Sequence, residues 1–212
     1  MKRGFAKMVL FVFAVLLLSV GPASASLIYE YSVVYSGRTP SGTAPWMTAT
    51  FEAGAPGTVN LTLTGVNLSS TEFVSSFSFN YGGASPITGI GFTTPWTGAS
   101  AGYSLNGYKA GGAQGFDIQV LFPTSNRQDR FQNGDTAYLT IYGATDPNAF
   151  YATNAGPSIM GIYTGAHVQG IAGLPGISEG SGWAAVPIPP TVWLLGAGLL
   201  GLVAIRRGFL KQ

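Results

Sequence analysis

Few residues of this chain could perform nucleophilic or acid–base chemistry. Ser100 lies in a Gly-x-Ser-x-Gly pattern and is followed by several aspartates and then by His167, the one histidine of the sequence. This order of serine, acid and histidine matches that of an α/β-hydrolase. In that fold the nucleophilic serine lies on a sharp turn between a strand and a helix. No helical pattern follows Ser100, however, so a glycine-rich loop between strands explains the same residues equally well. Ser178 fits the pattern too, but no acid and histidine follow it. A secreted serine hydrolase is therefore a remote alternative.

The composition limits the other chemistry that the chain could perform. The sequence has 212 residues, no cysteine and a single histidine. This excludes thiol catalysis, disulfides, multi-histidine metal centres and sites built from cysteine. His167 alternates with apolar neighbours, and a general base would need a nucleophile and an orienting acid beside it. We therefore expect a structural, hydrogen-bonded histidine, no cofactor and no enzymatic activity.

The longest polar stretch, residues 124–135, is a candidate ligand loop. Its chemistry-bearing side chains are those of Arg127, Asp129, Arg130, Asn133 and Asp135. One interpretation is a solvated loop with local ion pairs and a turn at Asn133-Gly134. The other is a loop that binds sugars through arginine, or calcium through the aspartate and asparagine oxygens, although the spacing does not fit the EF-hand.

Four aromatic residues lie in or beside the expected loops: Trp46, Trp96, Tyr103 and Tyr108. Aromatic rings in such positions can stack on sugar rings. In a small β-sandwich, the fold predicted below, they more often pack in the core or at its rim. A carbohydrate-binding module on a membrane anchor is therefore the second functional hypothesis.

The elements that must position these residues follow a period of two. In the segment 59–64, for example, Val59, Leu61 and Leu63 alternate with polar residues, which is typical of a half-buried strand. Candidate strands cover residues 27–35, 46–52, 59–64, 73–81, 87–93, 116–122, 136–142 and 158–168. In the segment 73–81 we expect Phe73, Phe77, Phe79 and Tyr81 to share one face. The sequence predicts an all-β, antiparallel β-sandwich of about eight strands over residues 26–171, followed by a glycine-rich spacer over 172–185.

The N-terminal segment, residues 1–25, is typical of a signal peptide. Lys2, Arg3 and Lys7 precede an apolar run of 13 residues, and Ala23-Ser24-Ala25 supplies the small residues that signal peptidase accepts before Ser26. A retained membrane anchor is the alternative, but this run is short for a span that needs about 20 residues.

The C-terminal segment, residues 186–212, has three parts. A proline-rich motif, Val186-Pro187-Ile188-Pro189-Pro190, precedes fifteen uncharged residues (191–205), and Arg206-Arg207 follow. The apolar part predicts a single transmembrane helix, and the arginines should stay in the cytoplasm because basic residues resist translocation. A buried C-terminal helix is the alternative.

These three parts together resemble a PEP-CTERM sorting signal, and the motif is most similar to the variant that reads Val-Pro-Leu-Pro-Ala. In that family an exosortase, a membrane-embedded cysteine transpeptidase of Gram-negative bacteria, recognises and processes the tail. The resemblance implies that this chain has such an enzyme as a partner. It also implies a link to extracellular polysaccharide or biofilm production.

The charge distribution argues against nucleic-acid binding. Residues 26–190 hold four basic and eight acidic residues, a net charge of −4, whereas nucleic acids require a cationic face. We expect a non-enzymatic protein that is exported across the inner membrane. Its precursor would be anchored in the membrane with the C-terminus in the cytoplasm, and the processed protein would lie at the cell surface or in the extracellular matrix.

The first prediction is that the mature chain begins at Ser26, because the sequence Ala23-Ser24-Ala25 matches the specificity of signal peptidase. N-terminal sequencing of the protein from its native cells checks this. Recovery of Met1 or of another residue before Ser26 would refute the cleavage site.

Overall fold

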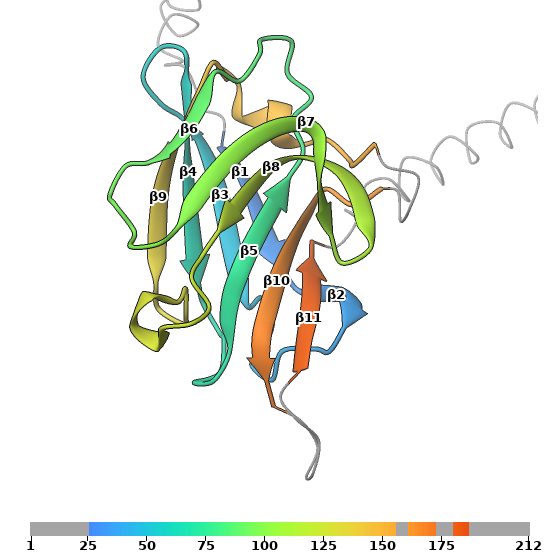
Figure 1. Ribbon diagram of the computed structural model, residues 1–212. Helices are drawn as coiled ribbons and strands as arrows, with labels where there is room; N and C mark the ends of the chain where they lie inside the picture. Colours follow the sequence, from blue (N-terminus) through green and yellow to red (C-terminus); the bar gives the residue numbers. More distant parts are fainter. Residues whose placement is uncertain (1–25, 156–160, 173–179, 187–212) are drawn as a thin grey trace, which may run out of the picture.

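The computed structural model describes residues 26–155, 161–172 and 180–186, which form two antiparallel sheets packed face to face (Figure 1). The five-stranded sheet has the spatial order β1 (Ser26–Tyr31), β3 (Met47–Ala53), β4 (Thr58–Gly65), β9 (Thr136–Tyr142) and β6 (Gly89–Phe92). The six-stranded sheet has the order β2 (Val33–Gly37), β11 (Gly180–Ala185), β10 (Thr164–Ile171), β5 (Phe73–Phe79), β8 (Ala113–Leu121) and β7 (Ser100–Ala110). Two short 3₁₀ helices, η1 (Arg127–Asp129) and η2 (Pro147–Phe150), lie in the connections. The predicted antiparallel sandwich is confirmed.

The core between the sheets is rich in aromatic rings. Phe77 of one sheet meets Tyr31 of the other at a centroid distance of 5.6 Å, and Phe51 stacks on Phe150 at 4.3 Å. A buried hydrogen bond also joins the sheets, because the hydroxyl groups of Tyr31 and Thr164 are hydrogen-bonded to each other. Thr164 Oγ1 in turn donates to the carbonyl of Ser78. Edge-on and offset ring contacts of this kind stabilise a core beyond the area that they bury.

Strand β5 differs from the expected one-faced strand. The register against β10 shifts between His167 and Val168, so that the residues at Ser75 and Ser76 form a bulge. Val74 consequently enters the core together with Phe77. Phe73 does not belong to that cluster, and the guanidinium carbon of Arg130 lies 4.1 Å from the centroid of its ring. An extra residue in a strand reverses the phase of every side chain before it, which explains the difference.

The segment 27–35 forms two strands instead of one. β1 pairs with β3 in the five-stranded sheet, whereas β2 pairs with β11 in the other sheet. The change of sheet occurs at Ser32, whose N–H donates to the carbonyl of Ala185. This corner, together with β7 and β11, raises the number of strands in the described residues to eleven.

Strand β7 lies where the sequence predicted a glycine-rich loop. It is an edge strand of eleven residues, and its pairing with β8 is irregular between Tyr103 and Tyr108. Asn106 lies within this irregular part with a φ of 53°, and its N–H donates to Asp117 Oδ1. Because most of β7 is partly or fully exposed, it lacks the apolar alternation by which strands are recognised.

The predicted spacer over 172–185 is wrong for its second half. Residues Gly180–Ala185 form β11, which lies between β10 and β2 (Figure 1). Glycine is needed here, since a Cβ at Gly182 would lie 1.8 Å from the carbonyl oxygen of Arg38. The β domain therefore continues to residue 185. The prediction failed there because a strand built from small residues has the same composition as a flexible linker.

The predicted signal peptide and the predicted helix over 191–205 lie outside the described residues. Within residues 26–155, 161–172 and 180–186, no helix is long and apolar enough to span a bilayer.

A buried glutamate secures the connection that leads into β5. Glu72 is fully buried, and its two carboxylate oxygens accept hydrogen bonds from the N–H groups of Ser41 and Ser69 at 2.7 and 2.8 Å. One side chain thus satisfies two backbone donors from segments that are about thirty residues apart.

The second prediction is that Glu72→Gln destabilises the domain by about 1–3 kcal/mol, because an amide nitrogen cannot accept and leaves one buried donor unsatisfied. Thermal unfolding measures the loss. The matched control is Glu30→Gln, which changes an exposed side chain and should alter stability by less than about 0.5 kcal/mol. Equal effects of the two substitutions would contradict the role of Glu72.

Candidate functional site

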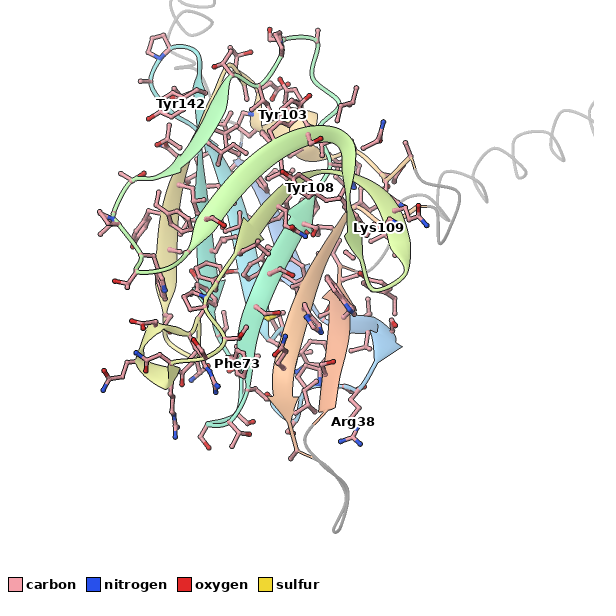
Figure 2. The ribbon with its side chains drawn as sticks, in the orientation of Figure 1. Arg38, Phe73, Tyr103, Tyr108, Lys109 and Tyr142 are labelled. Atoms are coloured by element: carbon pink, nitrogen blue, oxygen red, sulfur yellow. The ribbon has the colours of Figure 1, made fainter. Side chains whose placement is uncertain are left out.

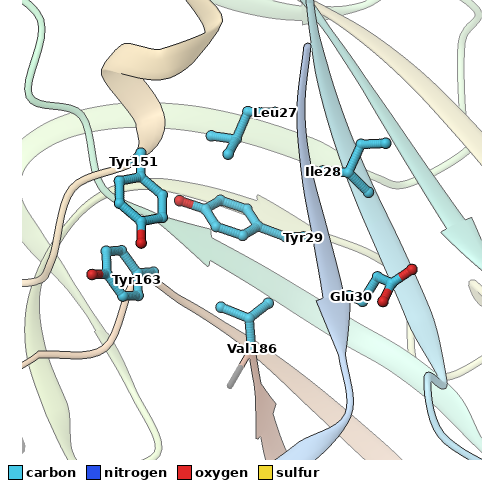
Figure 3. A pocket seen from close by; sticks show the side chains of 7 residues that line it. All are labelled: Leu27, Ile28, Tyr29, Glu30, Tyr151, Tyr163 and Val186. Carbon is cyan, nitrogen blue, oxygen red and sulfur yellow. The ribbon is translucent and has the colours of Figure 1, made fainter. Parts of the chain in front are cut away.

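The chain leaves the described fold at Val186, and a pocket lies beside this point. The pocket has a volume of about 300 Å³ and is lined by Leu27, Ile28, Tyr29, Glu30, Tyr151, Tyr163 and Val186. Figure 3 shows the rings of Tyr29, Tyr151 and Tyr163 gathered on one side of β1, with Val186 next to them. Tyr151 and Tyr163 stack with a centroid distance of 4.5 Å. The chain thus exits beside a concave, mainly aromatic surface.

The phenols of Tyr29 and Tyr151 in this pocket stay neutral near pH 7. A side-chain hydrogen bond to Tyr163, followed by burial and by the charge of Tyr163, raises the pKa of Tyr151 to about 12. Burial is the main cause that raises the pKa of Tyr29 well above its usual value, and its hydroxyl donates to the carbonyl of Phe150 at 2.7 Å. Neutral phenols of this kind contribute apolar area and hydrogen bonds, which suits binding.

Val186 is the one residue of the predicted sorting motif that the structure describes. It is partly buried and packs against the main core, directly after β11. The rest of the motif (187–190) and Arg206-Arg207 lie outside the described residues, as do Ala23 and Ala25 of the predicted signal cleavage site. Ser26 is the first residue of β1 and is exposed.

His167 lies on β10 in a packed, hydrogen-bonded environment. Its Nδ1 is 2.9 Å from the hydroxyl oxygen of Ser75, the extra residue of the β5 bulge, which adjoins the register partner Ser76. Its ring stacks on Trp183 of β11 with a centroid distance of 4.5 Å and an angle of 10°. Burial lowers the pKa of His167. The histidine thus holds β5, β10 and β11 together, as the structural interpretation predicted.

The structure does not bring Ser100 and His167 together. Ser100 is the exposed first residue of β7, at the edge of the six-stranded sheet, and it is not on a strand-to-helix turn. The strand register places Ser100, Leu121, Ser76 and His167 in one row across β7, β8, β5 and β10, so that three strand spacings, about 14 Å, lie between the backbones of Ser100 and His167. This is far beyond hydrogen-bond reach. Ser178 lies outside the described residues.

The polar stretch 124–135 uses its arginines to hold its own conformation. Arg127 donates to the carbonyl of Ser70 at 3.0 Å, and Arg130 Nε donates to the carbonyl of Thr124 at 2.8 Å. The guanidinium of Arg130 also covers the ring of Phe73. Both cations therefore anchor the loop to the end of the sandwich.

The acidic and amide side chains of the same loop are engaged with local donors. Asp135 accepts from the N–H of Gln132 at 2.6 Å, and Asn133 accepts from the N–H of Leu68 at 3.1 Å. Asp129 accepts from the side chain of Asn126 at 2.7 Å. In the part of the chain that the structure describes, no three acidic or histidine side chains come together in a way that could hold a metal ion.

The two tryptophans considered for sugar stacking are packed into the protein. Trp46 is buried and donates to the carbonyl of Gly42 at 2.7 Å. Trp96 packs on Phe122 and Phe131 and donates to the carbonyl of Asp129. They join core and loops instead of presenting a ring to solvent.

Of the tyrosines on β7 and β9, the sequence pattern singles out Tyr103 and Tyr108 but not Tyr138 and Tyr142. Tyr103 and Tyr108 of β7 are only partly exposed and pack against buried clusters, and Figure 2 shows them on the curved edge strand. Tyr138 and Tyr142 of β9 are about half exposed. The signal for this second pair was available, because Leu139 and Ile141 fix the inward phase of β9 and leave both tyrosines on the outer face.

Comparisons with family models, with curated proteins and with solved structures returned no match for this chain. The resemblance of the tail to a PEP-CTERM signal therefore stays a prediction.

The third prediction concerns the pH dependence of stability. Since burial lowers the pKa of His167 in the folded state, the unfolded chain binds the proton first as the pH falls below about 6.5. The stability contributed by neutral His167 is present above this pH and decreases below it. We expect the unfolding temperature to fall between pH 7.5 and 5.5.

The matched variant is His167→Gln, which keeps a polar side chain but does not titrate. Its unfolding temperature should depend less on pH over the same range, because histidine is the side chain that normally changes charge there. Identical pH profiles of the two proteins would refute the role of His167.

Proposed function

We propose that this chain is an exported, non-enzymatic cell-surface or extracellular-matrix protein that is processed through its C-terminal sorting signal. The observation that carries the proposal is the position of Val186. β11 ends at Ala185, Val186 packs on the core, and the proline motif begins at the next residue. The folded domain and the predicted processing site are thus contiguous.

This arrangement suits cleavage within the motif. Prolines lack the backbone N–H and have a restricted φ, so residues 187–190 favour an extended conformation, in which proteases bind their substrates. Every strand that the structure describes is complete before Pro187. A cut after that point would remove the tail without breaking a strand, and a processing enzyme would meet the aromatic pocket beside Val186.

The predicted partners act at the two limits of the described domain. Signal peptidase would release the chain before Ser26, where β1 begins. An exosortase-type transpeptidase would act near residues 187–190, while residues 191–205 span the membrane and Arg206-Arg207 keep the end in the cytoplasm. The mature domain would then be displayed at the cell surface or in a matrix rich in exopolysaccharide.

The non-enzymatic part of the proposal rests on the site geometry. Ser100 and His167 lie on strands separated by two others, and His167 is engaged with Ser75 and Trp183. The phenols of Tyr29 and Tyr151 in the pocket beside Val186 are neutral near pH 7. These side chains favour a role in binding and packing.

The fourth prediction is that changing both Pro187 and Pro189 to Ala causes most of the protein to accumulate as uncut precursor in the membrane. The double variant should still insert, because residues 191–205 and the arginines are unchanged, but the cleavage motif loses its fixed extended shape. Mass spectrometry of the protein in membrane and released fractions of native cells measures the outcome. The matched control is Pro175→Ala, which changes a proline outside the motif and should be processed normally.

Retention of the complete tail by the wild-type protein in native cells would overturn the sorting proposal and leave a single-span anchor. Processing of the double variant at the wild-type rate would show that the prolines do not define the cleavage site.

A further inference from the structure

The outer face of the five-stranded sheet presents ordered rows of polar and aromatic side chains. Strand register places Thr50, Thr62 and Tyr138 in one row across β3, β4 and β9. The next row contains Glu52, Asn60 and Thr140 in the same three strands. We propose that this face binds an extended, uncharged polysaccharide that runs along β9.

Two tyrosines supply the stacking surfaces of the proposed site. Tyr138 and Tyr142 are 50% and 49% exposed and lie on the same face of β9, about 13 Å apart along the strand. The ring of Tyr142 lies beside Gly89 of β6, where an added Cβ would be 3.7 Å from its Cδ2. At Gly91 an added Cβ would meet nothing within 4 Å. The glycines of β6 therefore leave the sheet surface open beside the rings, and Figure 2 shows Tyr142 at the end of β9 next to β6.

A groove of about 320 Å³ lies beside Tyr138 and contains the polar row of Glu52, Asn60 and Thr140. It is lined by Glu52, Asn60, Leu61, Thr62, Thr93, Thr94, Tyr138, Leu139 and Thr140. Thr93 and Thr140 share a hydrogen bond at 3.2 Å. Within the described residues, the side chains of Glu52, Asn60 and Thr62 make no hydrogen bond to protein. Carboxylate, amide and hydroxyl groups that are free in this way can bond to sugar hydroxyls, while the rings stack on the sugar faces.

The charge of this face selects against acidic polymers. The five strands of the sheet contain no lysine or arginine, and their charged residues are Glu30 and Glu52. A polyanion would meet only like charge here. The straight alignment of the rings along one strand suits an extended chain, which favours a β-linked neutral polysaccharide.

The test measures retention of the full-length chain, in a neutral detergent, on insoluble cellulose and on β-1,4-mannan, with alginate beads as the acidic polymer. We expect retention on at least one neutral polymer and none on alginate. Tyr138→Ala and Tyr142→Ala should each weaken binding about tenfold, since each removes one stacking contact.

Two control variants separate stacking from structural effects. Tyr138→Phe keeps the ring and should bind like the wild type. Tyr151→Ala changes a tyrosine that is 44% exposed but lines the pocket beside Val186, and it should also bind like the wild type. Unfolding temperatures show whether each variant is folded.

The proposal is overturned if the wild type is retained on neither neutral polymer, or if folded Tyr138→Ala and Tyr142→Ala variants bind as tightly as the wild type. Retention on alginate alone would also overturn it and indicate a cationic surface elsewhere. Because the measurement does not depend on tail cleavage, it can fail while the sorting proposal stands, and the reverse also holds.

Discussion

The domain depends on burying a layer of aromatic rings between two sheets that carry few charges. Phe77 meets Tyr31 across this layer, and Phe51 meets Phe150. The layer requires Val74 and Phe77 to point inward together, which an unbroken strand cannot do because neighbouring odd and even positions face opposite sides. The bulge of β5 resolves this conflict, and the same bulge places Ser75 against His167. The contact between Ser75 and His167, the one histidine of the sequence, is therefore a consequence of core packing.

The sequence predicted the strands that alternate and missed those that do not. In β4 and β9 one face is apolar and the other is polar, so Val59–Thr64 and Thr136–Tyr142 were recognisable with nearly the observed bounds. β7 and β11 are built largely from glycine, serine and alanine. They pair through backbone hydrogen bonds and the close approach of neighbouring backbones, and they show no alternation of apolar and polar side chains. Pairing between distant segments leaves no local trace, so the corner at Ser32 could not be predicted either. The position of Trp183 on His167 depends on these pairings as well.

The residues available for recognition lie away from those with catalytic chemistry. The hydroxyl of Ser100 is at one edge of the six-stranded sheet, whereas the exposed rings of β9 and the aromatic pocket at Val186 belong to other surfaces. Once the inward phase of β9 is fixed by Leu139 and Ile141, the tyrosines must face solvent. The alternation of side chains along a strand thus gives a β-sandwich both its buried apolar core and its regularly spaced, solvent-exposed side chains.

The position of β11 also determines how the domain responds to mechanical force. Any tension that reaches the fold from residue 187 onward enters through Val186 and β11. β11 has a neighbouring strand on each side, so a pull along its axis shears two hydrogen-bond ladders at once. An edge strand pulled perpendicular to its axis would instead lose its hydrogen bonds one after another. Because β11, the last strand within the described residues, lies inside the sheet, the domain resists being peeled apart from the end by which it would be tethered.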